Sequence, residues 1–218
     1  MIVYLFDIDG TLLHAHGSGR GAFDDVFAAH HGVAAASEGV RYGGKTDPAL
    51  VDEIFAARLG RPPSAAERAA FLDAYVPRLR ARLAASAARV IEGVAEALAF
   101  LATRTDVRLG VATGNIREGA DAKLASAGLG RWFQFGGYGS DSALRAELVA
   151  HAIARAGVQP REVIVIGDTI HDIAAARACS ATVCAVATGT DPADRLGHAD
   201  AVFTSLAELP AWHATRFG

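Results

Sequence analysis

The chain has 218 residues, of which 51% are hydrophobic and 21% charged, and its formal net charge is −3. These fractions are typical of a folded globular protein and exclude extensive disorder. The length exceeds that of one average domain but not of two, which favours one core domain with an insertion. Because the charge is slightly negative and the arginines are scattered, we expect no nucleic-acid partner.

The first predicted element is a buried strand, Ile2 to Phe6. The apolar start of the chain has no basic leader and reaches Asp7 too early for a signal peptide. No apolar run approaches the roughly 20 residues that a membrane-spanning helix needs. Cys179 and Cys184 lie in segments typical of a helix end and a buried strand, where a free thiol behaves as a small hydrophobe. We therefore expect a cytoplasmic protein with no membrane partner.

The segment between this strand and the next apolar run, at Val107, is too long for one crossover helix. Apolar residues recur within it at helical spacing over Gly19 to His31, Pro48 to Leu59 and Ser64 to Ala84. Ser64 and Glu67 form a capping-box pattern, which predicts a helix start. The sequence therefore predicts an all-helical cap of residues 14–90, inserted into a core of residues 1–13 and 91–218.

The rest of the chain alternates between buried strands and helices. The further strands predicted are Val107 to Ala112, Val163 to Ile166 and Thr182 to Ala187. They are nearly continuously apolar, as in a parallel sheet covered on both faces. The predicted helices are Ile116 to Ala127, Asp141 to Ala156 and Ile170 to Ala178. This alternation of strands and helices predicts an α/β fold with a doubly wound parallel sheet.

Polar residues follow three of these strands. Asp7 and Asp9 end the first strand, and carboxylates two residues apart on an extended segment face the same side, which suits a divalent cation. Thr113, Gly114 and Asn115 follow the second strand and precede a helix, an arrangement that can bind phosphate. Each pattern is also compatible with an ordinary turn.

Asp168 and Asp172 follow the strand Val163 to Ile166. Asp172 lies one helical turn beyond Asp168, where it can hold Asp168 or a metal-bound water. In doubly wound sheets, ligands bind outside the carboxyl ends of the strands. The coincidence of all three patterns at such ends favours one shared site over three unrelated turns.

The order Asp-x-Asp-Gly-Thr, Thr-Gly-Asn and Gly-Asp-Thr-x-x-Asp resembles motifs I, II and IV of haloacid dehalogenase-like (HAD) phosphatases. The resemblance spans nearly the whole chain and implies a Rossmann-like core with a helical cap inserted after motif I. The segments Gly44 to Asp47 and Lys123 to Leu129 resemble the phosphoglycolate phosphatase branch.

This resemblance also implies a chemistry. Asp7 would be the nucleophile and form an aspartyl phosphate, and Asp9 would be the acid and base. Mg²⁺ would be bound by Asp7, Asp168 and the carbonyl of Asp9, with Asp172 bound directly or through water. Thr113 and a basic residue would hold the phosphoryl oxygens.

One position departs from the family pattern. Family members carry a lysine at the start of the helix before motif IV, whereas this chain has Ser142 to Arg145 there. Arg145 and Lys123 are the two candidates for the missing cation. Lys123 is favoured slightly, because Arg145 lies about two positions beyond the expected lysine and would face another side of its helix.

The expected activity is hydrolysis of a small phosphate ester, with phosphoglycolate as one candidate. Arg20 and Lys45 in the cap are expected to contact an acidic or polyhydroxy substrate. Alternatives are a phosphomutase of the same fold and a non-catalytic module that binds phosphate or magnesium. The protein is expected to be a monomer or a homodimer.

Overall fold

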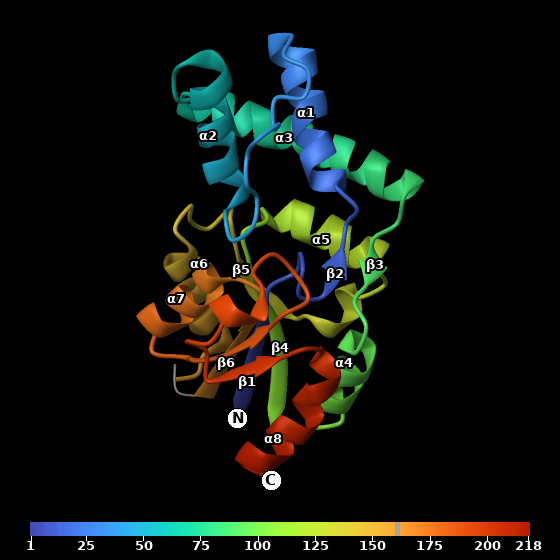
Figure 1. Ribbon diagram of the computed structural model, residues 1–218, viewed down its shortest axis with the longest axis vertical. Helices are drawn as coiled ribbons and strands as arrows, with labels where there is room; N and C mark the ends of the chain where they lie inside the picture. The colour runs from blue at the N-terminus through green and yellow to red at the C-terminus, as the bar shows by residue number, and fades with distance from the viewer. Residues whose placement is uncertain (160–161) are drawn as a thin grey trace.

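A six-stranded parallel sheet forms the centre of the computed structural model, which describes residues 1–159 and 162–218 (Figure 1). The strand order is β5-β4-β1-β6-β7-β8. The strands are β1 (Ile2–Phe6), β4 (Val107–Thr113), β5 (Phe135–Tyr138), β6 (Val163–Gly167), β7 (Thr182–Val186) and β8 (Ala201–Phe203). The doubly wound parallel sheet expected from the sequence is confirmed.

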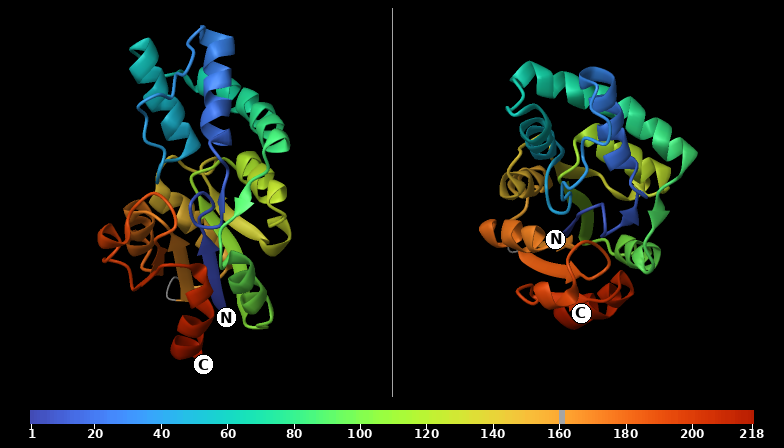
Figure 2. Two further views of the ribbon diagram at one scale, coloured as in Figure 1. Left: turned by 45° about the vertical axis from the view of Figure 1, so that its right-hand side comes forward. Right: turned by 45° about the horizontal axis from the view of Figure 1, so that its top comes forward.

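Helices cover both faces of this sheet (Figure 2). On β1, Val3 and Leu5 belong to the apolar core beneath α6 (Arg145–Ala156) and α7 (Ile170–Ala178). The alternate residues Tyr4 and Phe6 belong to the core on the other face, which includes α4 (Val94–Ala102) and α8 (Leu209–Phe217). Because both faces are buried, β1 has no charged residue until it ends, and the first carboxylate, that of Asp7, emerges at its carboxyl end.

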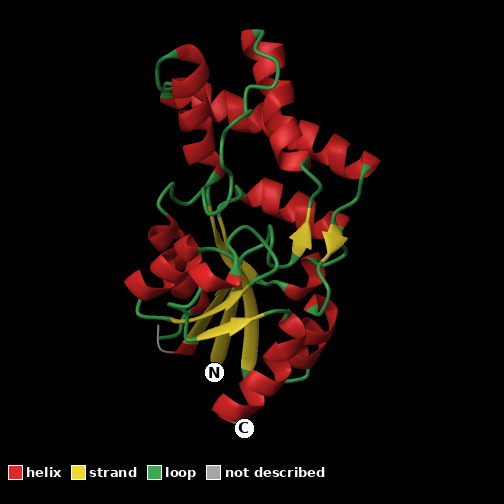
Figure 3. Cartoon of the chain, in the orientation of Figure 1, coloured by secondary structure: helices red, strands yellow, loops and turns green. Residues whose placement is uncertain are grey.

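Three helices lie over the carboxyl ends of the strands: α1 (Ser18–His31), α2 (Asp47–Leu59) and α3 (Ala65–Ala85) (Figure 3). Phe23, Phe27 and Phe71 pack together between them, with ring centroids 5.0 to 5.2 Å apart. The capping box at the start of α3 is present as predicted. None of the helices in the described part of the chain is both long enough and apolar enough to cross a bilayer.

The chain passes twice between these three helices and the sheet, and the two passages are paired. The short strands β2 (Leu13–His14) and β3 (Arg89–Val90) form an antiparallel ribbon (Figure 1). The purely helical prediction for this region missed the ribbon, because two residues are too few to show a strand period. The division into a core of residues 1–13 and 91–218 and a cap of residues 14–90 stays an interpretation.

Several core elements were absent from the sequence prediction. β5 has the sequence Phe-Gly-Gly-Tyr, which has no β-branched residue, and β8 has only three residues. The helix expected from Asp141 begins instead at Arg145. The carboxylate of Asp141 accepts from the amide of Tyr138, and the hydroxyl of Ser142 accepts from the amide of Leu144. These side chains stabilise a turn in place of the first helical turn.

Candidate active site

The site lies where three adjacent strands end. In the sheet, Phe6 of β1 is level with Val111 of β4 and Ile166 of β6. Asp7, Thr113 and Asp168 therefore lie together at the carboxyl ends of these strands, beneath the helices of residues 14–90. The three polar patterns found in the sequence converge on one place.

Asp7, Asp168 and Asp172 form an acid cluster, in which each residue offers one oxygen and these oxygens lie within 4.8 Å of one another. All three side chains are buried. Thr169 caps α7 and fixes Asp172, because its amide and hydroxyl both donate to the Asp172 carboxylate. Asp168 accepts from the amide of Thr190, 2.6 Å away. Its other oxygen accepts from the hydroxyl of Thr11 over 3.2 Å, so both carboxylate oxygens of Asp168 are held in place.

The acid cluster concentrates negative charge away from water. Burial raises the pKa of Asp7 above the usual carboxyl range, and the negative charges of Asp172 and Asp9 add to the rise although Arg145 opposes it. Burial and the charges of Asp172 and Asp7 raise the pKa of Asp168 in the same way. Oxygen donors at this spacing fit a hard divalent cation such as Mg²⁺, which would restore the ionised form of the acids.

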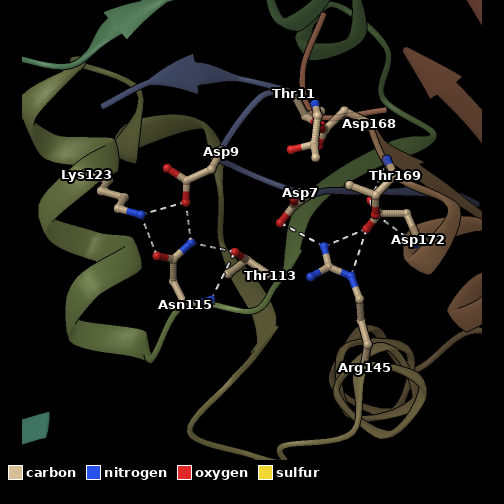
Figure 4. Close-up of polar contacts among 11 residues, drawn as sticks. Asp7, Asp9, Thr11, Thr113, Asn115, Lys123, Arg145, Asp168, Thr169 and Asp172 are labelled. Atoms are coloured by element: carbon tan, nitrogen blue, oxygen red, sulfur yellow. Dashed lines mark hydrogen bonds and ion pairs between the residues drawn. The ribbon is translucent and has the colours of Figure 1, made fainter. Parts of the chain in front are cut away.

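Arg145 is the cation of the acid cluster (Figure 4). Its guanidinium lies 3.0 Å from Asp7 and also donates to Asp172, and its side chain is only 9% exposed. The expectation that Arg145 faces another side of its helix is wrong. Because α6 begins at Arg145 and not at Asp141, the arginine is its first residue, and its side chain reaches the acid cluster from there.

Lys123 also lies in the site, but with different partners. It comes from α5 (Arg117–Ser126) and donates to Asp9 over 2.6 Å and to the side-chain oxygen of Asn115 over 2.7 Å. The amide nitrogen of Asn115 donates to Asp9 and to the hydroxyl of Thr113, each over 2.8 Å. Figure 4 shows this group beside Asp7 and on the opposite side from Arg145. The side chain of Asp9 is thus bound by nitrogen donors rather than joined to the acid cluster.

Gly114 allows the segment around Lys45 to lie close against the turn of Thr113, Gly114 and Asn115. A Cβ atom at this position would lie 2.2 Å from the carbonyl oxygen of Lys45. The amide of Asp47 donates to the Gly114 carbonyl over 2.7 Å, and the carboxylate of Asp47 accepts from the amide of Ile116 over 2.8 Å. A carboxylate from the cap region therefore caps the first turn of α5, whose own N-cap residue provides no side-chain bond.

The strand ends and the cap enclose a cavity of about 370 Å³. Its walls include Asp7, Thr113 and Arg145 from the sheet side, and Arg20 and Lys45 from the cap side. Arg20 donates to the carbonyls of residues 37 and 40 and lies over a tyrosine ring at residue 42. Lys45 pairs with a glutamate at residue 53. Both predicted cap cations therefore reach the cavity.

Sequence reasoning missed two residues of this site. Asp47 belonged to the segment Gly44 to Asp47 that resembles the phosphoglycolate phosphatase branch, but it was given no role of its own. Tyr75 was part of an apolar helical spacing on α3, and it lines the cavity. Only the packing of the cap on the sheet brings these two residues to the site. The buried state of Asp47 could not be inferred from its sequence neighbours.

A parallel sheet with acids at its strand ends and helices above them defines an α/β protein with a covered cavity at the carboxyl ends of its strands. A family model described as haloacid dehalogenase-like hydrolase matches residues 3–180. The chain therefore belongs to the haloacid dehalogenase-like hydrolases. The resemblance stated from the motifs is confirmed at the level of the family.

Solved structures of similar fold agree with this assignment. CbbY from Rhodobacter sphaeroides in complex with phosphate has 23% identity and a TM-score of 0.77, with 96% of each chain covered. A variant of CbbY in complex with xylulose-(1,5)bisphosphate has 22% identity, the same TM-score and the same coverage. A protein described as putative β-phosphoglucomutase from Thermotoga maritima has 19% identity and a TM-score of 0.65, with 99% of each chain covered. At these identities the likeness shows the fold alone. No curated protein matches the sequence.

The buried carboxylate of Asp47 gives a prediction about stability. Burial raises its pKa to about 6 in the folded protein, from 3.8, although Lys123 opposes the rise. A raised carboxyl pKa means that the folded state binds the proton more tightly, so the free energy of unfolding falls as the pH rises from about 4 to about 6. Asp47→Asn removes this loss. The free energy of unfolding of Asp47→Asn minus that of the wild type should be larger at about pH 7.5 than at about pH 4.5. The increase should be on the order of 2 to 3 kcal/mol.

Urea unfolding of both proteins at the two pH values measures this difference. Asp47→Ala is the control, because it also removes the acceptor of the Ile116 amide and should be less stable than Asp47→Asn at both pH values, by about 1–3 kcal/mol. A difference between wild type and Asp47→Asn that is the same at both pH values would contradict the prediction.

Proposed function

We propose that the protein is a magnesium-dependent phosphomonoester hydrolase in which Asp7 is the nucleophile. The observation that carries this proposal is the position of Asp7 between a buried acid cluster and a fixed cation, Arg145, 3.0 Å away. A phosphate monoester dianion repels a carboxylate, so a nucleophilic aspartate needs positive charge around the phosphoryl group. Arg145 offers such positive charge on one side of Asp7. The acid cluster offers oxygen donors that can bind a divalent cation.

In the proposed reaction, an oxygen of Asp7 attacks phosphorus, and the bond between phosphorus and the ester oxygen breaks. Asp9 gives its proton to the departing oxygen and then takes a proton from the water that attacks the aspartyl phosphate. That attack breaks the bond between phosphorus and Asp7 and releases inorganic phosphate. The hydroxyl of Thr113 and the guanidinium of Arg145 bind the phosphoryl oxygens.

Asp7 and Asp168 are the residues that we propose as ligands of Mg²⁺, together with the carbonyl of Asp9. When bound, the ion supplies positive charge that neutralises the acids and the phosphoryl oxygens. Asp172 already accepts from Thr169 and from Arg145, so it suits contact with a metal-bound water better than direct coordination.

The substrate we propose is a small phosphorylated metabolite. A cavity of about 370 Å³ is at the small end of ligand sites. Arg20 and Lys45 in its wall suit a carboxylate, a second phosphate or several hydroxyls on the far side of the substrate. Phosphoglycolate and sugar phosphates meet this description, and CbbY binds a sugar bisphosphate. Hydrolysis of a panel of phosphate esters, measured as kcat/KM for release of inorganic phosphate, would rank them.

A phosphomutase is the second candidate, because a putative β-phosphoglucomutase shares the fold over 99% of each chain. A mutase would return the phosphoryl group to its product, so it would yield an isomeric phosphate and little inorganic phosphate. A non-catalytic module would do neither.

We further propose a cytoplasmic location and a monomer or homodimer as the active form.

Asp7→Asn should abolish turnover while the fold is kept. The amide is a poor nucleophile of nearly the same size as the carboxylate, so kcat/KM should fall by on the order of 10³-fold or more. Hydrolysis of a chromogenic phosphate ester and circular dichroism would be measured on the same preparations. Activity within about tenfold of the wild type would overturn the proposed mechanism.

Removal of Mg²⁺ should remove activity and lower thermal stability together. Excess chelator would stop hydrolysis, and Mg²⁺ but not Ca²⁺, which prefers longer bonds and more ligands, would restore it. Since binding stabilises the folded state, added Mg²⁺ should also raise the Tm of the wild type and leave that of Asp168→Asn nearly unchanged. Full activity in chelator, or an equal Tm response of both proteins, would contradict the metal assignment.

Arg145→Ala should lower kcat/KM by on the order of 10²-fold at saturating Mg²⁺, as expected for a group that stabilises charge in the transition state. Arg145→Lys should recover part of the loss. Arg155→Ala is the matched control, because Arg155 lies on the same helix but pairs with Asp141, and it should leave the rate unchanged. A loss of less than about threefold for Arg145→Ala would place the required cation elsewhere.

A further inference from the structure

Lys123 has a set of partners that the proposed mechanism has not yet used. Its ammonium donates to Asp9 over 2.6 Å and to Asn115 over 2.7 Å, and the side chain is almost fully buried. Asn115 in turn donates to the same oxygen of Asp9, over 2.8 Å. One carboxylate oxygen of Asp9 is therefore bound from two directions, by a cation and by an amide (Figure 4).

A buried lysine is costly unless its charge is paired, so its place indicates a specific electrostatic role. Lys123 has the negative charge of Asp9 beside it, and Asp47 in the cap is near enough for Lys123 to lower its pKa. Gly19 on α1 also lies over the ammonium, where a Cβ atom would be 3.6 Å from Nζ. The cap thus covers the ammonium of Lys123, while the side chain of Asp9 beside it stays open to the cavity.

The two cations of the site have separate partners. Arg145 contacts Asp7 and Asp172, whereas Lys123 contacts Asp9 and Asn115. Asp9 itself is 42% exposed at its side chain, so without Lys123 and Asn115 it has room for other rotamers. A proton-transfer group must lie within hydrogen-bond reach of the reacting oxygen, and free rotation would lower the fraction of molecules in which it does.

We propose that Lys123 is a positioning residue for Asp9: with Asn115 it fixes the Asp9 carboxylate for proton transfer, and it affects catalysis only through Asp9. This proposal rests on the proposed function, in which Asp9 protonates the departing oxygen. It replaces the sequence-based hypothesis that Lys123 supplies the missing phosphate cation, a role that we give to Arg145.

The leaving group of the substrate distinguishes these roles. The alkoxide released from an alkyl phosphate needs a proton as the phosphorus–oxygen bond breaks, whereas nitrophenolate leaves without one. Lys123→Met, which keeps the chain length and removes the charge, should lower kcat/KM for an alkyl phosphate by on the order of 10²-fold. For p-nitrophenyl phosphate the loss should be less than about fivefold. Arg145→Ala, in contrast, should lower both values by a similar factor.

A double-mutant cycle provides the second test. If Lys123 acts only through Asp9, then Lys123→Met in an Asp9→Asn background should change kcat/KM for the alkyl phosphate by less than about twofold. Lys123→Arg, which keeps a donor and a charge, should recover part of the activity. Circular dichroism and thermal unfolding would verify the fold, and Lys123→Gln would take the place of any Lys123→Met protein that does not fold.

Equal losses for the two esters, or a further loss in the Asp9→Asn background, would overturn the proposal, because Lys123 would then act on the phosphoryl group directly. No loss for either ester would overturn it as well. Failure of the proposed function is distinguishable from these outcomes, because the wild-type protein would then hydrolyse neither ester in the presence of Mg²⁺.

Discussion

The mutual repulsion of carboxylates buried at the ends of β1 and β6 is the constraint on which the rest of the site depends. Asp7, Asp168 and Asp172 each offer an oxygen within 4.8 Å of the others, and burial together with the neighbouring negative charges raises the pKa of Asp7 and of Asp168. Arg145 supplies one positive charge, and the oxygen donors leave a place for a divalent cation. The same geometry that costs stability in the resting protein would favour the binding of a metal and a dianionic phosphate.

The cap and the sheet are joined by hydrogen bonds at the phosphate-binding turn itself. The Asp47 amide and carboxylate bond to both sides of that turn, and the hydroxyl of Thr46 donates to the carbonyl of Ala143 over 3.1 Å. The position of Thr113 therefore depends on residues that come from the cap. The same contacts thus cover the cavity and hold the turn of Thr113, Gly114 and Asn115.

The sequence predicted the sheet because its buried strands are continuously apolar, and it predicted the acids because they end those strands. It failed where short-range patterns are weak: β5 is half glycine, and the ribbon of β2 and β3 has two residues in each strand. The expected direction of Arg145 was wrong for a different reason. The turn before Arg145 moved the helix start, and a helix start decides which way a side chain points.

The pairing of Leu13 with Val90 places the two ends of the segment that carries α1, α2 and α3 side by side. An inserted segment whose ends lie side by side can change in length or in sequence without pulling on the strands that carry Asp7 and Asp168. In the proposed function, the cap residues that would select a substrate and the strand-end residues that would perform the chemistry can therefore vary separately. The same arrangement of strand-end residues is therefore compatible with caps of different length and sequence.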